Sequence, residues 1–183
     1  MMDFESAYQR LLEDERTSKV ELLTLRSAHP EGTSKEVKRS SPIHNTVDHV
    51  VLIKGRGVRG DRSYDGDRGP YVEDLAIMDI KALHAIRIVL SHMGDGPLPG
   101  DNLLCDYPLD ALRPGDVLWI GDALVEISPK AHTACDRFAA RFGKDAARWV
   151  NKNRDRNLRG VKAVVLQSGV VKVGSTISEI SYE

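Results

Sequence analysis

Two short apolar segments on either side of a tight turn most constrain what this chain can fold into. Val117–Ile120 is rich in β-forming residues, Gly121-Asp122 is a strong turn signal, and Ala123–Ser128 alternates apolar and polar residues. Pro114-Gly115 marks a turn just before the first segment. The sequence therefore predicts an antiparallel hairpin that ends near Pro129.

A single cysteine, Cys135, follows this hairpin and is predicted to lie in the first turn of a helix. Thr133 is a suitable N-cap, and Asp136 supplies an acidic residue three positions later. The positive end of the helix dipole favours a thiolate, whereas the Asp136 carboxylate disfavours it. His132 is a candidate to orient or deprotonate the thiol. The alternatives are that Cys135 is a small packed hydrophobe and that His132 is an ordinary loop residue.

The other apolar segments are also short and are separated by glycine-led turns. They favour a mostly β fold, a closed or partly closed antiparallel β-barrel decorated by α-helices. Strands are expected at 20–25, 47–53, 75–78, 161–167 and 170–173, with the last two joined as a hairpin by Ser168-Gly169. Helices are expected at 4–15 and from Asp79, which can cap the second one, to about residue 92, and a loop is expected at 29–41.

Length and composition limit the class of protein. A chain of 183 residues predicts a single domain over 1–183. Residues 1–16 are expected to form a helical appendage that packs either on the barrel or on a second copy of the chain. The second arrangement would give a homo-oligomer. Two cysteines cannot form a disulfide framework, which indicates a reducing, cytoplasmic location. The first residues do not resemble a secretory signal and no apolar run is long enough to cross a bilayer, so no membrane partner is expected.

Positive charge is concentrated immediately after the cysteine, although the formal net charge of the chain is only -1. Residues 137–159 contain eight basic and two acidic side chains, and helical spacing places four of the basic ones on one face. Guanidinium groups match phosphate, so this segment is predicted to bind an anion; a solvated basic face is the alternative. Nucleic acid is disfavoured as a partner because few aromatic residues are present to stack on bases. The candidate anion-binding residues here are Arg137, Arg154, Arg156 and Arg159.

Five short motifs, in a fixed order, carry a family resemblance. They are GVRGDR at 57–62, PGDNL at 99–103, LRPGDVLWIG at 112–121, the single Cys135, and the glycine-bounded strands of 160–174. Together they resemble the MOSC domain, a module named after the C-terminal part of molybdenum cofactor sulfurases, over most of the chain. Asp101 stands where the family usually has glutamate, and Ser175 where aspartate is common.

The resemblance implies a role for Cys135 in molybdenum cofactor or metal-sulfur chemistry. Family members carry sulfur on this cysteine as a persulfide or use it to ligate molybdenum in a pterin cofactor, and the molybdenum-bound members reduce N-hydroxylated compounds with electrons from separate redox proteins. A cysteine desulfurase would be the partner for sulfur transfer and would contribute pyridoxal phosphate. Asp61, Arg62 and Asn102 are further candidates for cofactor binding. The alternative is a non-catalytic module that keeps the fold and binds an anion or a protein, which the departures at Asp101 and Ser175 favour.

Overall fold

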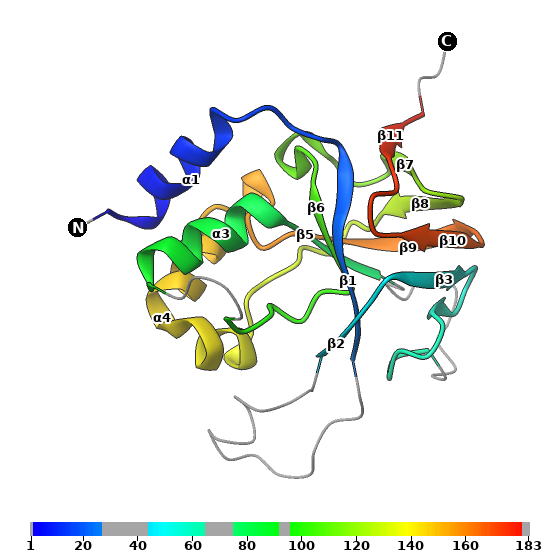
Figure 1. Ribbon diagram of the computed structural model, residues 1–183, viewed down its shortest axis with the longest axis horizontal. Helices are drawn as coiled ribbons and strands as arrows, with labels where there is room; N and C mark the ends of the chain where they lie inside the picture. The colour runs from blue at the N-terminus through cyan, green and yellow to red at the C-terminus, as the bar shows by residue number, and fades with distance from the viewer. Residues whose placement is uncertain (1, 27–43, 65–74, 92–95, 181–183) are drawn as a thin grey trace.

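The computed structural model describes residues 2–26, 44–64, 75–91 and 96–180. An eight-stranded sheet with the order β11-β7-β8-β9-β5-β6-β1-β2 curls into a half-barrel that is open rather than closed, and a small sheet β10-β3-β4 lies beside it (Figure 1). The strands are β1 (Lys19–Arg26), β2 (His44–Val47), β3 (His49–Ile53), β4 (Gly57–Val58), β5 (Leu75–Asp79), β6 (Leu103–Asp106), β7 (Val117–Ile120), β8 (Ala123–Ile127), β9 (Val161–Gln167), β10 (Gly169–Lys172) and β11 (Ile177–Glu179). The helices are α1 (Phe4–Leu12), α3 (Ile80–Val89) and α4 (Asp136–Lys152), with short 3-10 turns η1 (Leu109–Ala111) and η2 (Arg154–Arg156).

The predicted partly closed, mostly β fold with added helices is confirmed, and so is the central hairpin. β7 and β8 pair antiparallel with Val117 opposite Glu126 and Ile120 opposite Ala123. The expected pairing of the last two strands is wrong. β9 pairs with β5 and β8, whereas β10 crosses to β3 of the small sheet. Strand β11, which pairs with β7, was not anticipated.

The path of β10 has a local cause at its first residue. The missing side chain of Gly169 allows its backbone to lie directly against the peptide unit of Asp122, where a Cβ would collide. The Asp122 amide also donates to the Val170 carbonyl at 3.1 Å. Strand β10 is thus held over the end of the β7–β8 hairpin and cannot fold back on β9.

Helix α3 connects the one parallel pair of strands, β5 and β6, within the described parts of the chain. The predicted cap is confirmed, because the Asp79 carboxylate accepts a hydrogen bond from the Lys81 amide at 2.9 Å. The helix ends at Val89, before the residues near 92 where its end was expected. Residues 29–41, predicted as a loop, lie outside the described residues.

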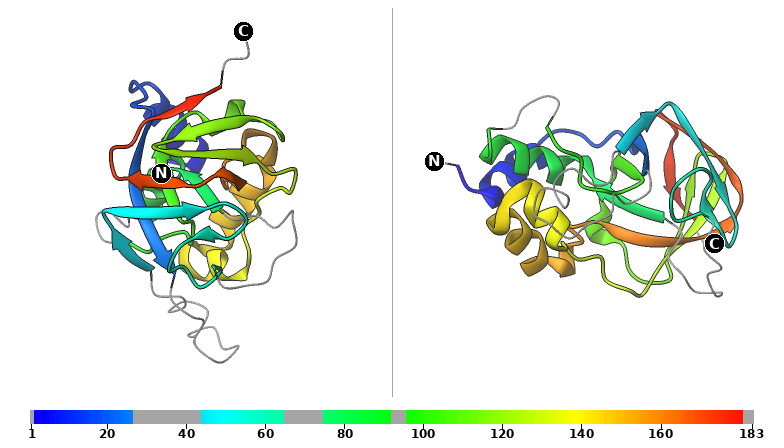
Figure 2. Two further views of the ribbon diagram at one scale, coloured as in Figure 1. Left: turned by 90° about the vertical axis from the view of Figure 1, so that its right-hand side faces the viewer. Right: turned by 90° about the horizontal axis from the view of Figure 1, so that it is seen from below.

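Two apolar cores follow from the alternation of side chains across β6. Leu103 and Cys105 pack inside the half-barrel, whereas Leu104 points to a second cluster that includes Met78 and the three helices. α1, α3 and α4 gather on one side of the sheet, away from the small sheet (Figures 1 and 2). Cys105 is fully buried in the first cluster.

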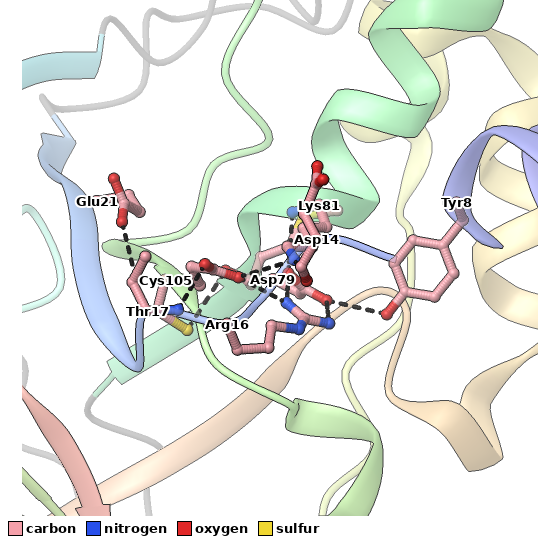
Figure 3. A network of polar contacts seen from close by, with 10 residues as sticks. Tyr8, Asp14, Arg16, Thr17, Glu21, Asp79, Lys81 and Cys105 are labelled. Atoms are coloured by element: carbon pink, nitrogen blue, oxygen red, sulfur yellow. Dashed lines mark hydrogen bonds and ion pairs between the residues drawn. The ribbon is translucent and has the colours of Figure 1, made fainter. Parts of the chain in front are cut away.

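The N-terminal helix, predicted at 4–15, packs on α3 and α4 of its own chain. Phe4 stacks on Trp149 with ring centroids 5.5 Å apart. The Tyr8 hydroxyl donates to Asp79 at 2.9 Å, and Arg16 donates to both oxygens of the same carboxylate (Figure 3). Burial, followed by the nearby charge of Asp79, raises the pKa of Tyr8 above its usual range. The first 16 residues therefore close the helical core rather than project from it.

Candidate functional site

Cys135 is the N-cap of α4 and presents an exposed thiol at the start of the helix. Its backbone is extended, with φ −91° and ψ 177°, and its carbonyl accepts the first helical hydrogen bond from Ala139 at 3.0 Å. The helix begins at Asp136, so the prediction that Thr133 caps it is wrong by two residues. The thiol makes no capping hydrogen bond, which leaves its sulfur turned to the surroundings of the helix start.

The residue before the cysteine is held by a side chain that sequence analysis missed. Asn151, in the later part of α4, accepts from the Ala134 amide at 2.8 Å and donates to the Ala134 carbonyl at 3.2 Å. An amide group satisfies both polar groups of one peptide residue in this way, as a neighbouring strand would. Asn151 therefore fixes the position of Cys135 relative to α4. A polar residue at a partly buried helix position is the signal that could have revealed it.

Helix α4 is broken at Gly143, and this break divides the basic face predicted for the helix. Gly143 has φ 86° and ψ 162°, a conformation essentially confined to glycine. Arg137 and Arg141, before the break, are partly buried, whereas Arg148, after it, is 74% exposed and pairs with Asp145. The continuous basic stripe expected from helical spacing is therefore wrong.

The partly buried guanidinium groups form a cluster close to Cys135. Arg141 Nη1 donates to the Leu98 carbonyl at 3.1 Å and lies close to Gly100, as does His44 Nε2. Burial lowers the pKa of Arg141, the charge of Cys135 opposes this effect, and Arg137 adds to it.

Arg62 belongs to the same cluster. Burial and the charges of Arg26 and Arg137 lower the pKa of Arg62 to about 10. Neighbouring cations that lower the pKa of Arg62 and of Arg141 indicate an excess of positive charge at this place, and a bound anion would relieve it. We call Arg26, Arg62, Arg137 and Arg141 the arginine cluster.

Several buried nitrogen atoms around this cluster have no hydrogen-bond partner in the described parts of the chain. They are His44 Nε2, His132 Nδ1, Arg137 Nε and Arg159 Nε. A buried polar atom without a partner costs about 1–3 kcal/mol, so a group of them beside a thiol points to a ligand rich in acceptors. Burial, together with the charge of Arg141, lowers the pKa of His44 to about 4, and the imidazole is neutral at physiological pH.

Asp61 and Asn102 form the framework behind the arginine cluster. Asp61 accepts from Arg26 Nε at 2.9 Å, from Arg26 Nη2 at 2.8 Å and from Asn102 Nδ2 at 2.9 Å. Burial would raise the pKa of Asp61, but the hydrogen bonds from Arg26 and Ser63 outweigh it and hold the pKa well below its usual range. These side chains orient Arg26, and their predicted contact with a cofactor stays a prediction.

Asp101, Arg159 and His132 meet beneath the loop that precedes Cys135. Arg159 Nη1 donates to both Asp101 oxygens, at 2.7 and 3.0 Å, and its guanidinium carbon lies 4.8 Å from the centre of the Phe138 ring. His132 Nδ1 lies 3.4 Å from Asp101 Oδ1. Burial and the charge of Arg159 lower the pKa of His132 to about 3, so this histidine is neutral at physiological pH. The charges acting on it include those of Asp101, Arg159 and Lys162, and its predicted pairing with Cys135 stays a prediction.

The two remaining arginines predicted for the site lie elsewhere. Arg156 forms an ion pair with Glu5 at 2.8 Å and lies 5.5 Å from the centre of the Tyr8 ring, which fastens α1 to η2. Arg154 is exposed on η2 and lines a cavity that also includes His132. The structure thus brings Arg62 and Arg137 to the cysteine, whereas it places Arg154 and Arg156 away from the arginine cluster.

We expect Cys135 to react with iodoacetamide at least about tenfold faster than Cys105 in the native protein. Cys135 is exposed, whereas Cys105 is fully buried and burial raises its pKa well above the usual value. Brief labelling at pH 7.5 followed by peptide mass spectrometry measures both rates. Labelling in urea is the control, since the two rates should then converge. Faster native labelling of Cys105 would contradict the assignment.

Residues 94–178, slightly less than half of the chain, match the family model of the MOSC domain. The matched segment includes Cys135 at the start of α4, so this part of the chain is similar to MOSC domains. No curated protein matches the sequence significantly.

Solved structures with similar folds support the architecture. A hypothetical protein has a TM-score of 0.61 at 19% identity, covering 94% of this chain and 72% of that chain. YiiM from Escherichia coli has a TM-score of 0.58 at 16% identity, covering 90% and 71%. The YUAD protein from Bacillus subtilis has a TM-score of 0.57 at 16% identity, covering 92% and 99%. At these identities the likeness shows a shared fold.

Among the described residues, no group of three or more His, Cys, Asp or Glu side chains is placed to hold a metal ion. None of the helices in those same parts of the chain combines the length and the apolar character needed to span a bilayer.

Proposed function

We propose that Cys135 serves molybdenum cofactor chemistry, either as the protein ligand to molybdenum in a pterin cofactor or as a carrier of persulfide sulfur. The observation that carries the proposal is the exposed thiol next to a crowded, partly buried arginine cluster. A soft sulfur donor suits molybdenum and sulfur chemistry, and guanidinium groups suit a phosphate.

The described residues contain no group of three or more side chains placed to hold a metal ion. They therefore suit a metal that is already held by a cofactor, to which Cys135 would add one sulfur ligand. Arg62, Arg137 and Arg141 would hold the anionic part of the pterin cofactor, and the unpaired His44 Nε2 adds a polar contact. When bound, the cofactor would supply the redox centre for the reduction of N-hydroxylated compounds. Asn151 would hold Cys135 in place, so that the thiol can contact the metal while the arginine cluster contacts the anionic part of the same cofactor.

The same site suits a persulfide. A thiol at the N-cap of α4 lies at the positive end of the helix, which stabilises a terminal sulfur anion as it would a thiolate. A cysteine desulfurase, with its own pyridoxal phosphate, would deliver the sulfur, whereas an electron-transfer protein would serve the reductase function. Both reactions belong in a reducing compartment, and we place the protein in the cytoplasm.

The proposal is tested by comparing two arginines of the same helix. In protein produced in a molybdenum-replete host, Arg141→Ala should lose most of the bound molybdenum or sulfane sulfur, because it removes a cation from the arginine cluster. Arg148→Ala should keep the parent's content, because Arg148 is exposed and lies beyond the break at Gly143. Elemental analysis and cyanide-releasable sulfur give the readout, and thermal unfolding confirms that both variants are folded.

Equal contents of molybdenum or sulfane sulfur in the parent and the Arg141→Ala variant would show that the arginine cluster does not take part in the site. Equal loss in both variants would show that the effect is one of net charge and not of position.

A further inference from the structure

A cavity of about 340 Å³ lies between the segments that flank the β7–β8 hairpin, the start of β9 and η2. It is large enough for a small organic molecule, since ligand pockets begin at about 300 Å³. Cys135 and the arginine cluster are absent from its wall among the described residues, so it is separate from the site proposed above. His132 belongs to its wall and also contacts Asp101.

The polar part of this cavity is strongly cationic. Its basic side chains are Arg113, Lys130, Arg154 and Lys162, in addition to His132, and Asp155 is its single carboxylate among the described residues.

Two of these side chains can be described more closely. Arg113 Nη1 is held by the carbonyls of Asp110 and Leu112 at 2.9 and 2.8 Å. Lys162 shares the wall with His132, and its charge is among those that lower the pKa of this histidine, after burial and Arg159. Cations and a neutral histidine thus line the same cavity.

The imidazole of His132 gives the wall a fixed polar ring. Its side chain is only 10% exposed, and its Nδ1 lies 3.4 Å from Asp101 Oδ1, behind the wall of the cavity. Leu112, Ile127 and Val161 give the wall an apolar part, and Ser128 and Asn157 add neutral polar groups. Convergent cations on one part of the wall and apolar side chains on another match a molecule with an anionic head and an apolar body.

We propose that this cavity binds a small amphipathic organic anion, with a phosphate or comparable dianionic head and a ring or short chain as its body. The cations hold the head, and the apolar wall takes up the body. This inference goes beyond the proposed function and does not depend on it, because neither Cys135 nor any member of the arginine cluster is among the residues that line the cavity.

Phenyl phosphate is a suitable probe, and isothermal titration calorimetry measures its binding. We expect saturable binding to the parent protein. Arg154→Glu should weaken binding about tenfold or more, because a charge-assisted contact becomes a repulsion. Arg148→Glu makes the same change of charge on an exposed arginine outside the cavity and should leave the affinity within about twofold. Benzyl alcohol, which lacks the charged head, should bind far more weakly.

Three outcomes would overturn the inference. They are the absence of saturable binding to the parent, equal affinity of the parent and Arg154→Glu, and equal weakening by Arg154→Glu and Arg148→Glu. Arg141→Ala separates this site from the proposed function, because it removes a cation from the arginine cluster and should still bind phenyl phosphate as the parent does. Weakened binding in Arg141→Ala would place the anion at the arginine cluster and would also overturn a separate site.

Discussion

Cys135→Ser is expected to lose all bound molybdenum or persulfide sulfur while remaining as stable as the parent. The change removes the soft sulfur donor and keeps nearly the same shape. Serine is also a favourable N-cap residue, and Cys135 occupies the N-cap of α4, so the helix is expected to be unchanged or slightly stabilised. Elemental analysis, cyanide-releasable sulfur and urea unfolding on the same samples give the loading and the free energy of unfolding.

Cys105→Ala is the matched control for this experiment. Cys105 is fully buried inside the half-barrel, and its sulfur lies 3.8 Å from the Met78 carbonyl oxygen. Removing that sulfur leaves a small void and should cost about 1 kcal/mol of stability, with the loading unchanged. The two cysteines thus predict opposite results. A Cys135→Ser variant loaded like the parent would favour the non-catalytic anion-binding or protein-binding module.

Gly160→Ala is expected to lower the free energy of unfolding by roughly 3–5 kcal/mol. Gly160 has φ +96°, which side chains rarely adopt, and a Cβ there would collide with the carbonyl of Ile77 in β5. The collision involves the backbone of two paired strands, so no side-chain rotation can relieve it. Urea denaturation followed by circular dichroism measures the loss.

Gly115→Ala separates the two causes of this loss. Gly115 has nearly the same φ, +93°, but nothing lies within 4 Å of the position of its Cβ. It should therefore cost only the backbone strain, about 1–2 kcal/mol. Similar losses in both variants would show that the close approach to Ile77 contributes little. Gly160 also follows Arg159 directly, so we expect Gly160→Ala to disturb the contact between Arg159 and Asp101.

The elements predicted correctly are those with a local physical cause. The β7–β8 hairpin follows from apolar alternation around Gly121-Asp122, and α3 begins where the Asp79 side chain can cap it. The helix start next to Cys135 was predicted to within two residues, because capping preferences locate a helix end only to within a residue or two. Each of these features depends on neighbours within a few positions in the chain.

The composition of the candidate site was decided by long-range contacts. Helical spacing could not show that Gly143 divides the basic residues of α4 into a buried and an exposed group. It also could not show that His44 and Arg141 meet at Gly100, or that Arg156 pairs with Glu5.

What the sequence by itself determined is a resemblance to the MOSC domain, a hairpin, a capped helix and a cysteine at a helix start. Only the tertiary structure decided which arginines surround that cysteine, that Asp61 is directed to Arg26, and that Asn151 holds the residue before the thiol. The physical reason is that capping and turn formation act over a few residues, whereas charge crowding and burial depend on groups brought together from distant parts of the chain.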